Sequence, residues 1–294
     1  MTNEELLNVL VLHAIKMKTS DIHLTLRNGI SVLEFRTING LKTIRKFNLS
    51  QTLIEYIRFK SNLDLLDSFR PQTSHMMILL NHTTYNIRVA YVRNSSLQSM
   101  VMRILNPPNY FKLNTILNNT DYEYVLNQIH HKSGLIIISG TTGSGKTTTL
   151  YSILNSIKEL KIYTIEDPIE YTYDFLVQLE INNRQNLDFN SSIKQILRHD
   201  PNVIVIGEIR DEIEASAAFR CALTGHIVIT TIHANSCLYT ISRLRDLGVS
   251  MSLIKDALKC IIYQDLVVIN KQRTVLYDMA NKETILKYIE NQTF

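Results

Sequence analysis

The chain has 294 residues, 45% of them hydrophobic, so it can bury one large core or two smaller ones, and a disordered protein is excluded. The net charge is only +4, with lysines and arginines scattered among acids, so composition gives no support to nucleic-acid binding. Cys221, Cys237 and Cys260 stand far apart, which argues against a zinc site or a disulfide framework and for reduced thiols in the cytosol.

The first 105 residues predict a small α+β domain. Apolar residues recur at helical spacing from Leu7 to Met17, in a segment too short and too polar to span a membrane and without a signal-peptide cleavage pattern. We therefore expect a core-facing helix and no transmembrane segment. Asn39-Gly40 suits a tight hairpin. Around and beyond that pair the pattern predicts strands over 31–38 and 41–47, a helix over 51–59, and strands over 75–80, 84–92 and 97–105.

The run Asn106-Pro107-Pro108-Asn109 breaks any regular element, because prolines lack the amide donor and restrict the residue before them. It predicts a linker over 106–117. Beyond it, residues 118–294 form a second predicted domain in which helices and strands alternate. The predicted elements are helices over 121–131, 146–158, 190–198 and 211–222, and strands over 135–139, 161–166, 202–207 and 226–231. This alternation indicates an α/β domain with a mainly parallel sheet wrapped by helices.

A phosphate-binding loop follows the first strand of the second domain. Residues 140–147 read GTTGSGKT, which fits G-x-x-x-x-G-K-[ST]. Its glycines let amides point at phosphates, Lys146 would neutralise phosphate charge, and the Thr147 hydroxyl would ligate Mg²⁺. The alternative is a glycine-rich turn without a ligand. The residues predicted to bind nucleotide here are Gly140, Thr141, Thr142, Gly143, Ser144, Gly145, Lys146, Thr147 and Thr148.

Two acidic segments should lie on the same edge of the sheet as this loop, because each follows a predicted strand. Glu208 ends the apolar run 203–206 and is the candidate to hold Mg²⁺ or to orient the attacking water. Glu170 is the preferred general base for attack by water, and Glu166 is a second catalytic candidate. The alternatives are an ordinary strand-ending acid and a solvated turn.

His226 and His233 bracket the strand predicted at 226–231. Either could sense the γ-phosphate or contact a neighbouring subunit. A structural, hydrogen-bonded histidine is an equally good interpretation, and no third ligand stands at a spacing that would favour a metal site.

In this order and spacing, four motifs resemble those of the type II secretion and type IV pilus ATPases. They are the Walker A loop (140–147), the Asp box (166–170), the Walker B segment (200–211) and the His box (224–233). Residues 20–24, SDIHL, are similar to a signature of that family's N-terminal domain. The resemblance implies an ATPase with a RecA-like P-loop NTPase domain, preceded by a smaller PAS-like α+β domain, with ATP and Mg²⁺ as cofactors.

Within the family, the short chain without zinc-binding cysteines most resembles the ATPases of competence pseudopili. Residues 243–249 favour the assembly branch, whereas the usual Gln-Arg-Leu appears here as Gln264-Asp265-Leu266. The implied function is ATP hydrolysis that powers assembly of a type IV pilus-like competence pseudopilus. Alternatives are a pilus retraction ATPase, a RecA-like nucleic-acid translocase, and a nucleotide-binding regulator with little turnover.

The resemblance also implies partners and a location. We expect a homohexamer at the cytoplasmic face of the membrane, acting on an inner-membrane platform protein, with no direct contact to nucleic acid. In such hexamers N-terminal domains supply arginines to the nucleotide, which makes Arg88, Arg93 and Arg103 candidates. Each could equally be a surface arginine or part of a salt bridge.

Overall fold

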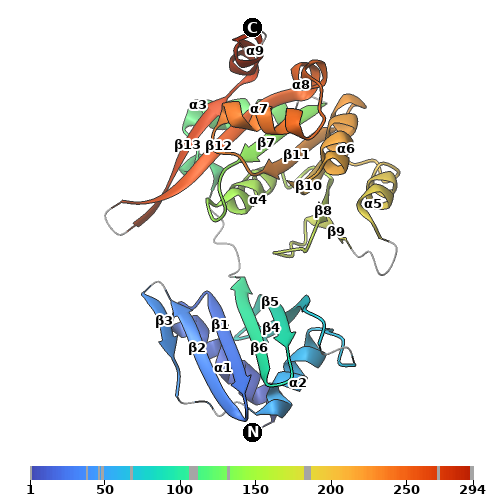
Figure 1. Cartoon of the computed structure of the whole chain (residues 1–294). Coiled ribbons are helices and arrows are strands. Elements are labelled where there is room, and N and C mark those ends of the chain that lie inside the picture. Colours follow the sequence, from blue (N-terminus) through green and yellow to red (C-terminus); the bar gives the residue numbers. More distant parts are fainter. Residues whose placement is uncertain are drawn as a thin grey trace. The chain divides into compact units, whose positions relative to one another are not determined.

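The computed structural model describes residues 2–37, 39–45, 47, 50–66, 69–105, 112–130, 133–181, 187–269 and 272–291. The chain divides into two compact units, Met1–Asn109 and Tyr110–Phe294 (Figure 1). Residues 106–111 of the predicted linker lie outside the described residues, and its later part holds the short 3-10 helix η1 (Leu113–Thr115). The domain limits expected from the sequence stay a prediction.

The first unit is an antiparallel sheet with two helices. Its elements are α1 (Asn3–Lys16), β1 (Asp21–Arg27), β2 (Ile30–Thr37), β3 (Gly40–Thr43), α2 (Gln51–Lys60), β4 (Gln72–Leu80), β5 (Thr83–Arg93) and β6 (Leu97–Leu105). The strands run in the order β3-β2-β1-β6-β5-β4, and Figure 1 shows α1 and α2 on one face of the sheet. Side chains alternate accordingly, because Ile87, Val89 and Tyr91 of β5 enter a core shared with the helices while Arg88 is exposed.

Three details of this unit differ from the sequence prediction. Strand β1 had no predicted counterpart, although Asn28 and Gly29 both take the positive φ that a tight turn between β1 and β2 requires. The predicted hairpin at Asn39-Gly40 forms one residue earlier, because the register pairs Thr37 with Gly40. Strand β3 also ends at Thr43 instead of residue 47.

The second unit is a seven-stranded sheet. Its elements are α3 (Asn119–His130), β7 (Gly134–Ser139), α4 (Lys146–Ser156), β8 (Ile162–Glu166), β9 (Leu176–Glu180), α5 (Phe189–Ile196), β10 (Val203–Ile209), α6 (Glu212–Leu223), β11 (Ile227–Ile232), α7 (Cys237–Asp246), α8 (Met251–Ala257), β12 (Leu258–Ile269), β13 (Gln272–Ala280) and α9 (Lys282–Asn291). The order is β13-β12-β7-β11-β10-β8-β9, in which β13 pairs antiparallel and the other neighbours pair parallel.

Both faces of this sheet are buried, which explains the uninterrupted apolar runs of its central strands. On β7, Leu135 and Ile137 enter a core with α5 to α9, whereas Ile136 and Ile138 enter a second core with α3 and α4. The elements predicted between 121 and 231 form within a few residues of their predicted bounds. Strand β9 and everything after β11 had no predicted counterpart.

Within the described part of the chain, no helix combines the length and apolarity needed to span a bilayer.

The separate cores of the two units predict separable unfolding. Ile137→Ala should remove about 3 kcal/mol of stability from the second unit, because the side chain is fully buried and its loss leaves a cavity. Calorimetry of Ile137→Ala should therefore show the unfolding transition of the second unit at a lower temperature and that of the first unit unchanged. Ile87→Ala, its counterpart in the first unit, should shift the other transition; equal shifts of one common transition in both variants would contradict this expectation.

Candidate functional site

The four sequence motifs meet at one edge of the second sheet. Strands β8, β10, β11 and β7 are parallel neighbours in that order, so their carboxyl ends lie together. The phosphate loop follows β7, the Asp box follows β8, Glu208 lies near the end of β10, and His233 directly follows β11. Ligands of open parallel sheets bind at this edge.

Glycine is required at two positions of the loop. Gly140 has φ +156°, and a Cβ built there would lie 2.3 Å from the carbonyl oxygen of Gln264. Gly145 has φ +89° and caps the N-terminus of α4. The loop can therefore curl tightly and leave amides at the start of the helix free for an anion.

The ammonium of Lys146 lies inside this loop. The residue is only 9% exposed, and its Nζ donates to the carbonyl oxygens of Gly140 and Thr141, both at 2.9 Å. Burial lowers the pKa of Lys146, and the charge of Glu208 partly opposes that shift. A buried cation that is poorly solvated favours an anionic ligand, since phosphate oxygens would replace the lost hydration.

The loop and its surroundings fit a nucleotide with Mg²⁺. The Ser144 hydroxyl is buried and has no hydrogen-bond partner within the described residues. Beside it, Thr147 offers a partly exposed hydroxyl in the first turn of α4, and Glu208 offers a carboxylate. Hydroxyl and carboxylate oxygens are ligands that Mg²⁺ prefers.

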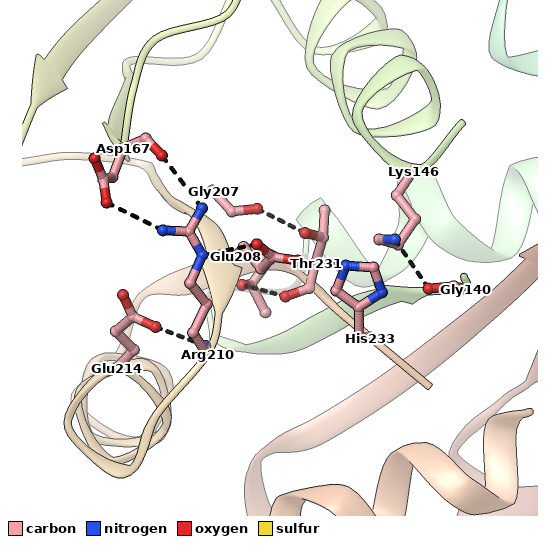
Figure 2. A network of polar contacts seen from close by, with 10 residues as sticks. Gly140, Lys146, Asp167, Gly207, Glu208, Arg210, Glu214, Thr231 and His233 are labelled. Carbon is pink, nitrogen blue, oxygen red and sulfur yellow. Dashed lines mark hydrogen bonds and ion pairs between the residues drawn. The ribbon is translucent and has the colours of Figure 1, made fainter. Parts of the chain in front are cut away.

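Glu208 belongs to a charged network centred on Arg210 (Figure 2). Arg210 Nε donates to Glu208 Oε2 at 2.8 Å, and Nη1 donates to Asp167 Oδ2 at 3.0 Å. On its other side, Glu208 Oε1 lies 3.2 Å from His233 Nε2. Figure 2 shows Lys146 on one side of the Glu208 and His233 pair and Arg210 on the other. The network thus joins the Asp box, the Walker B strand and the His box.

Arg210 and Asp167 were not among the predicted site residues. Asp167 lies in the Asp box and Arg210 in the Walker B segment. Only the fold shows that the Arg210 guanidinium binds the carboxylates of Asp167 and Glu208 together. The backbone amide of Arg210 is held by Glu214 Oε2 at 2.6 Å, and the hydrogen bond to Glu208 raises the pKa of Arg210. The arginine therefore stays charged while it holds two carboxylates.

Glu166 lies in a buried cluster of polar side chains. Tyr151 donates to its Oε2 at 2.5 Å, and Thr164 and Gln178 donate to its Oε1 at 2.6 and 2.9 Å. Burial and the adjacent carboxylate raise the pKa of Tyr151 far above its ordinary value. Since both oxygens of Glu166 accept hydrogen bonds, this arrangement ties α4 to β8 and β9 and suits a positioning role better than the predicted catalytic one.

Glu170 is partly buried in the segment after β8. Burial, followed by the charge of Glu170, raises the pKa of Tyr171, which places the carboxylate near that phenol. The general-base assignment stays a prediction.

The structure does not bring His226 to the phosphate loop of the same chain. The amide of Gly134, the first residue of β7, donates to the His226 carbonyl at 3.1 Å. The loop follows the other end of β7, roughly 20 Å away at about 3.3 Å per residue. The predicted contact to nucleotide therefore finds no support within one chain, whereas His233 lies at the edge with the loop.

The three candidate arginines lie in the first unit, on β5 and β6, and do not share a face. Arg88 and Arg103 are exposed and opposite each other in the register, and Arg103 Nε donates to Asp21 Oδ1 at 2.7 Å. Arg93 alternates to the helix-covered face, with its guanidinium 5.4 Å from the centre of the Phe69 ring. Arg88 and Arg103 thus share the face of the sheet opposite the helices, and Arg93 does not.

An open pocket of about 490 Å³ adjoins the loop. It is lined by Thr141, Thr142, His233, Ala234, Asn235, Tyr239, Ser242, Arg243 and Asp246. The loop, the His box and α7 thus line one recess.

The loop and the parallel sheet define a RecA-like P-loop protein. Residues 2–290 match the family model described as "Type II/IV secretion system protein". Type II secretion system protein E of Pectobacterium carotovorum subsp. carotovorum is 33% identical over 287 residues, which are 95% of this chain and 56% of that protein. The chain therefore belongs to the type II/IV secretion system protein family, as the sequence motifs predicted.

Two further similarities bear on which branch of the family the chain resembles. Competence protein ComGA of Halalkalibacterium halodurans is 35% identical over 265 residues, 88% of this chain and 76% of that protein. The solved structure of the pilus retraction motor PilT with bound ADP superposes with a TM-score of 0.78 and 27% identity, over 97% of this chain and 86% of that one. This confirms the predicted fold class; the PAS-like character of the first unit stays a prediction. The chain spans about half the length of the type II secretion proteins that it matches.

Tyr151→Phe should destabilise the second unit by about 2 kcal/mol, because it removes a buried hydrogen bond to a carboxylate. Chemical denaturation would measure the loss. Tyr163→Phe, on the same strand as Glu166 but outside the cluster, is the matched control and should cost less. Equal stability of Tyr151→Phe and the parent would mean that the cluster does not hold α4 to β8.

Proposed function

We propose that this chain binds Mg-ATP in the 140–147 loop and hydrolyses it to drive assembly of a type IV pilus-like competence pseudopilus. The observation that carries the catalytic part is the buried Lys146 ammonium beside Glu208, at the edge where all four motifs converge. The 35% identity to a ComGA protein over most of the chain supports the competence branch.

In this proposal the loop amides and Lys146 hold the β- and γ-phosphates. Thr147 and Glu208 hold Mg²⁺, which supplies positive charge to the phosphates. Glu170 takes the proton of the attacking water, and His233 stands near the γ-phosphate through its contact with Glu208. Arg210 keeps the Glu208 carboxylate in place, so that its orientation does not depend on the metal alone.

The motor part of the proposal is a homohexamer at the cytoplasmic face of the membrane that pushes on an inner-membrane platform protein. Arg88 and Arg103, exposed together on the first unit, are the candidates to reach a nucleotide in that ring and to couple closure to hydrolysis.

A retraction motor is the second candidate, because the likeness to PilT extends over 97% of the chain. Two experiments test these candidates: capture of membrane proteins with this chain from the native cell, and the pilus phenotype of a deletion strain, which separates assembly from retraction. Recovery of a platform protein together with loss of pilus assembly in a deletion strain supports the proposal; retained assembly with lost retraction supports the alternative.

Lys146→Ala should abolish detectable ATP turnover and weaken binding of Mg-ATP, because the buried cation that faces the phosphates is lost. Steady-state phosphate release and nucleotide titration measure both effects. Lys158→Ala removes an exposed lysine from the turn that follows α4 and is the matched control. Undiminished turnover in Lys146→Ala would exclude a catalytic role for the loop.

Glu170→Gln and Glu208→Gln should both keep nucleotide binding while slowing hydrolysis, Glu170→Gln by at least about 100-fold, the usual contribution of a general base. Single-turnover hydrolysis separates binding from chemistry. Glu159→Gln, an exposed glutamate after α4, is the control. Normal turnover by Glu170→Gln, with slow turnover by Glu208→Gln, would contradict the assignment of Glu170 as the general base. Glu208 would then be the remaining candidate.

A further inference from the structure

Strand β12 extends past β7 and runs beside the phosphate loop. Its register pairs Tyr263 with Ser139, the last residue of β7, so Gln264 comes next to Gly140, the first residue of the loop. β12 is twice as long as β7, with 12 residues against 6, and its second half continues as a hairpin with β13. A strand from far along the sequence therefore flanks the loop.

Three observations place Gln264 against the loop backbone. Its side-chain Nε2 donates to the Ser144 carbonyl at 2.7 Å, and the residue is fully buried. Its own carbonyl oxygen occupies the space that a Cβ at Gly140 would need, at 2.3 Å. Its Nε2 would lie 3.2 Å from a Cβ at Gly145. Gln264 thus contacts the beginning, middle and end of the loop before Lys146.

The hydrogen bond to the Ser144 carbonyl fixes a loop whose backbone amides must point at the phosphates. Ser144 is buried between the glycines whose conformations aim the amides at the phosphates. A loop of this kind loses conformational freedom when it binds, and a partner that fixes it beforehand lowers that cost. The Nε2 donor supplies one such fixed point from outside the loop.

We propose that Gln264 is a positioning residue that holds the phosphate loop in its nucleotide-binding conformation. The inference rests on the proposed binding of Mg-ATP by this loop. Asp265 takes no part in it: its Oδ1 accepts from the Leu266 amide at 2.8 Å, and strand alternation directs its side chain away from that of Gln264.

The test compares two substitutions of Gln264 with a control on the same strand. Gln264→Met keeps the length and removes the donor, whereas Gln264→Glu turns an oxygen toward the Ser144 carbonyl. Cys260→Ala deletes a fully buried side chain of β12 that lies opposite Ile136, away from the loop. Affinity is measured with fluorescent ADP, and the melting temperature with and without Mg-ATP.

We expect Gln264→Met to weaken ADP binding roughly tenfold, the effect of losing one buried hydrogen bond, and Gln264→Glu to weaken it more. In steady state KM should rise more than kcat falls, because the loop binds substrate before chemistry. Cys260→Ala should lower the melting temperature and leave the affinity within about twofold, as expected for a cavity away from the site.

Hydrogen exchange of the parent protein is a second test, which does not depend on whether a variant folds. Addition of ADP should slow hydrogen exchange in the peptide that contains Gln264, while the β1 and β2 hairpin stays unchanged. Parent-like affinity in both Gln264 variants, or unaltered exchange at β12 in a parent that binds ADP, overturns this inference and leaves the proposed function standing. A parent that binds no nucleotide overturns both.

Discussion

The buried ammonium of Lys146 is the constraint on which the rest of the site depends. A lysine at 9% exposure loses most of its hydration, and burial lowers its pKa, so the protein must compensate with oxygen atoms. Two loop carbonyls do so directly, and Glu208 contributes its charge from the end of β10. The same buried charge favours an anionic ligand at the loop. The glycines, the strand edge and the carboxylate are therefore parts of one electrostatic arrangement.

Much of that arrangement could be predicted from the sequence. The apolar run before the loop predicted β7, because a strand buried on both faces needs no alternation, and the strand before each acidic motif predicted that it lies at the same sheet edge as the loop. Strands β1 and β9 and the elements after β11 were not predicted. After β11 the apolar residues are shared between the helices α7, α8 and α9 and the edge hairpin of β12 and β13. Arg93 was grouped with Arg88, although the two lie five residues apart on β5, so strand alternation directs Arg93 to the helices and Arg88 to the other face.

The residues that sequence reasoning missed share a physical feature: each acts on another side chain instead of on a ligand. Arg210 holds Glu208 and Asp167, and Tyr151 holds Glu166. Motif patterns identify groups by the chemistry they offer to phosphate, metal or water, and a guanidinium that holds two carboxylates offers none. His226 shows the reverse case within one chain. Its type and motif suggested a ligand contact, yet six strand residues separate it from the edge where the loop lies.

The geometry also connects the loop with the segment that enters the second unit. Gln264 on β12 pairs with Tyr277 on β13, whose hydroxyl donates to Asp121 at 2.8 Å and accepts from the Asn118 amide at 2.9 Å. Asn118 directly precedes α3 and follows the predicted linker. A loop held by Gln264 is therefore tied, through one cross-strand pair, to the start of the unit that carries it. Within the second unit, the β12 and β13 hairpin thus contacts both the phosphate loop, through Gln264, and the residue that precedes α3, through Tyr277.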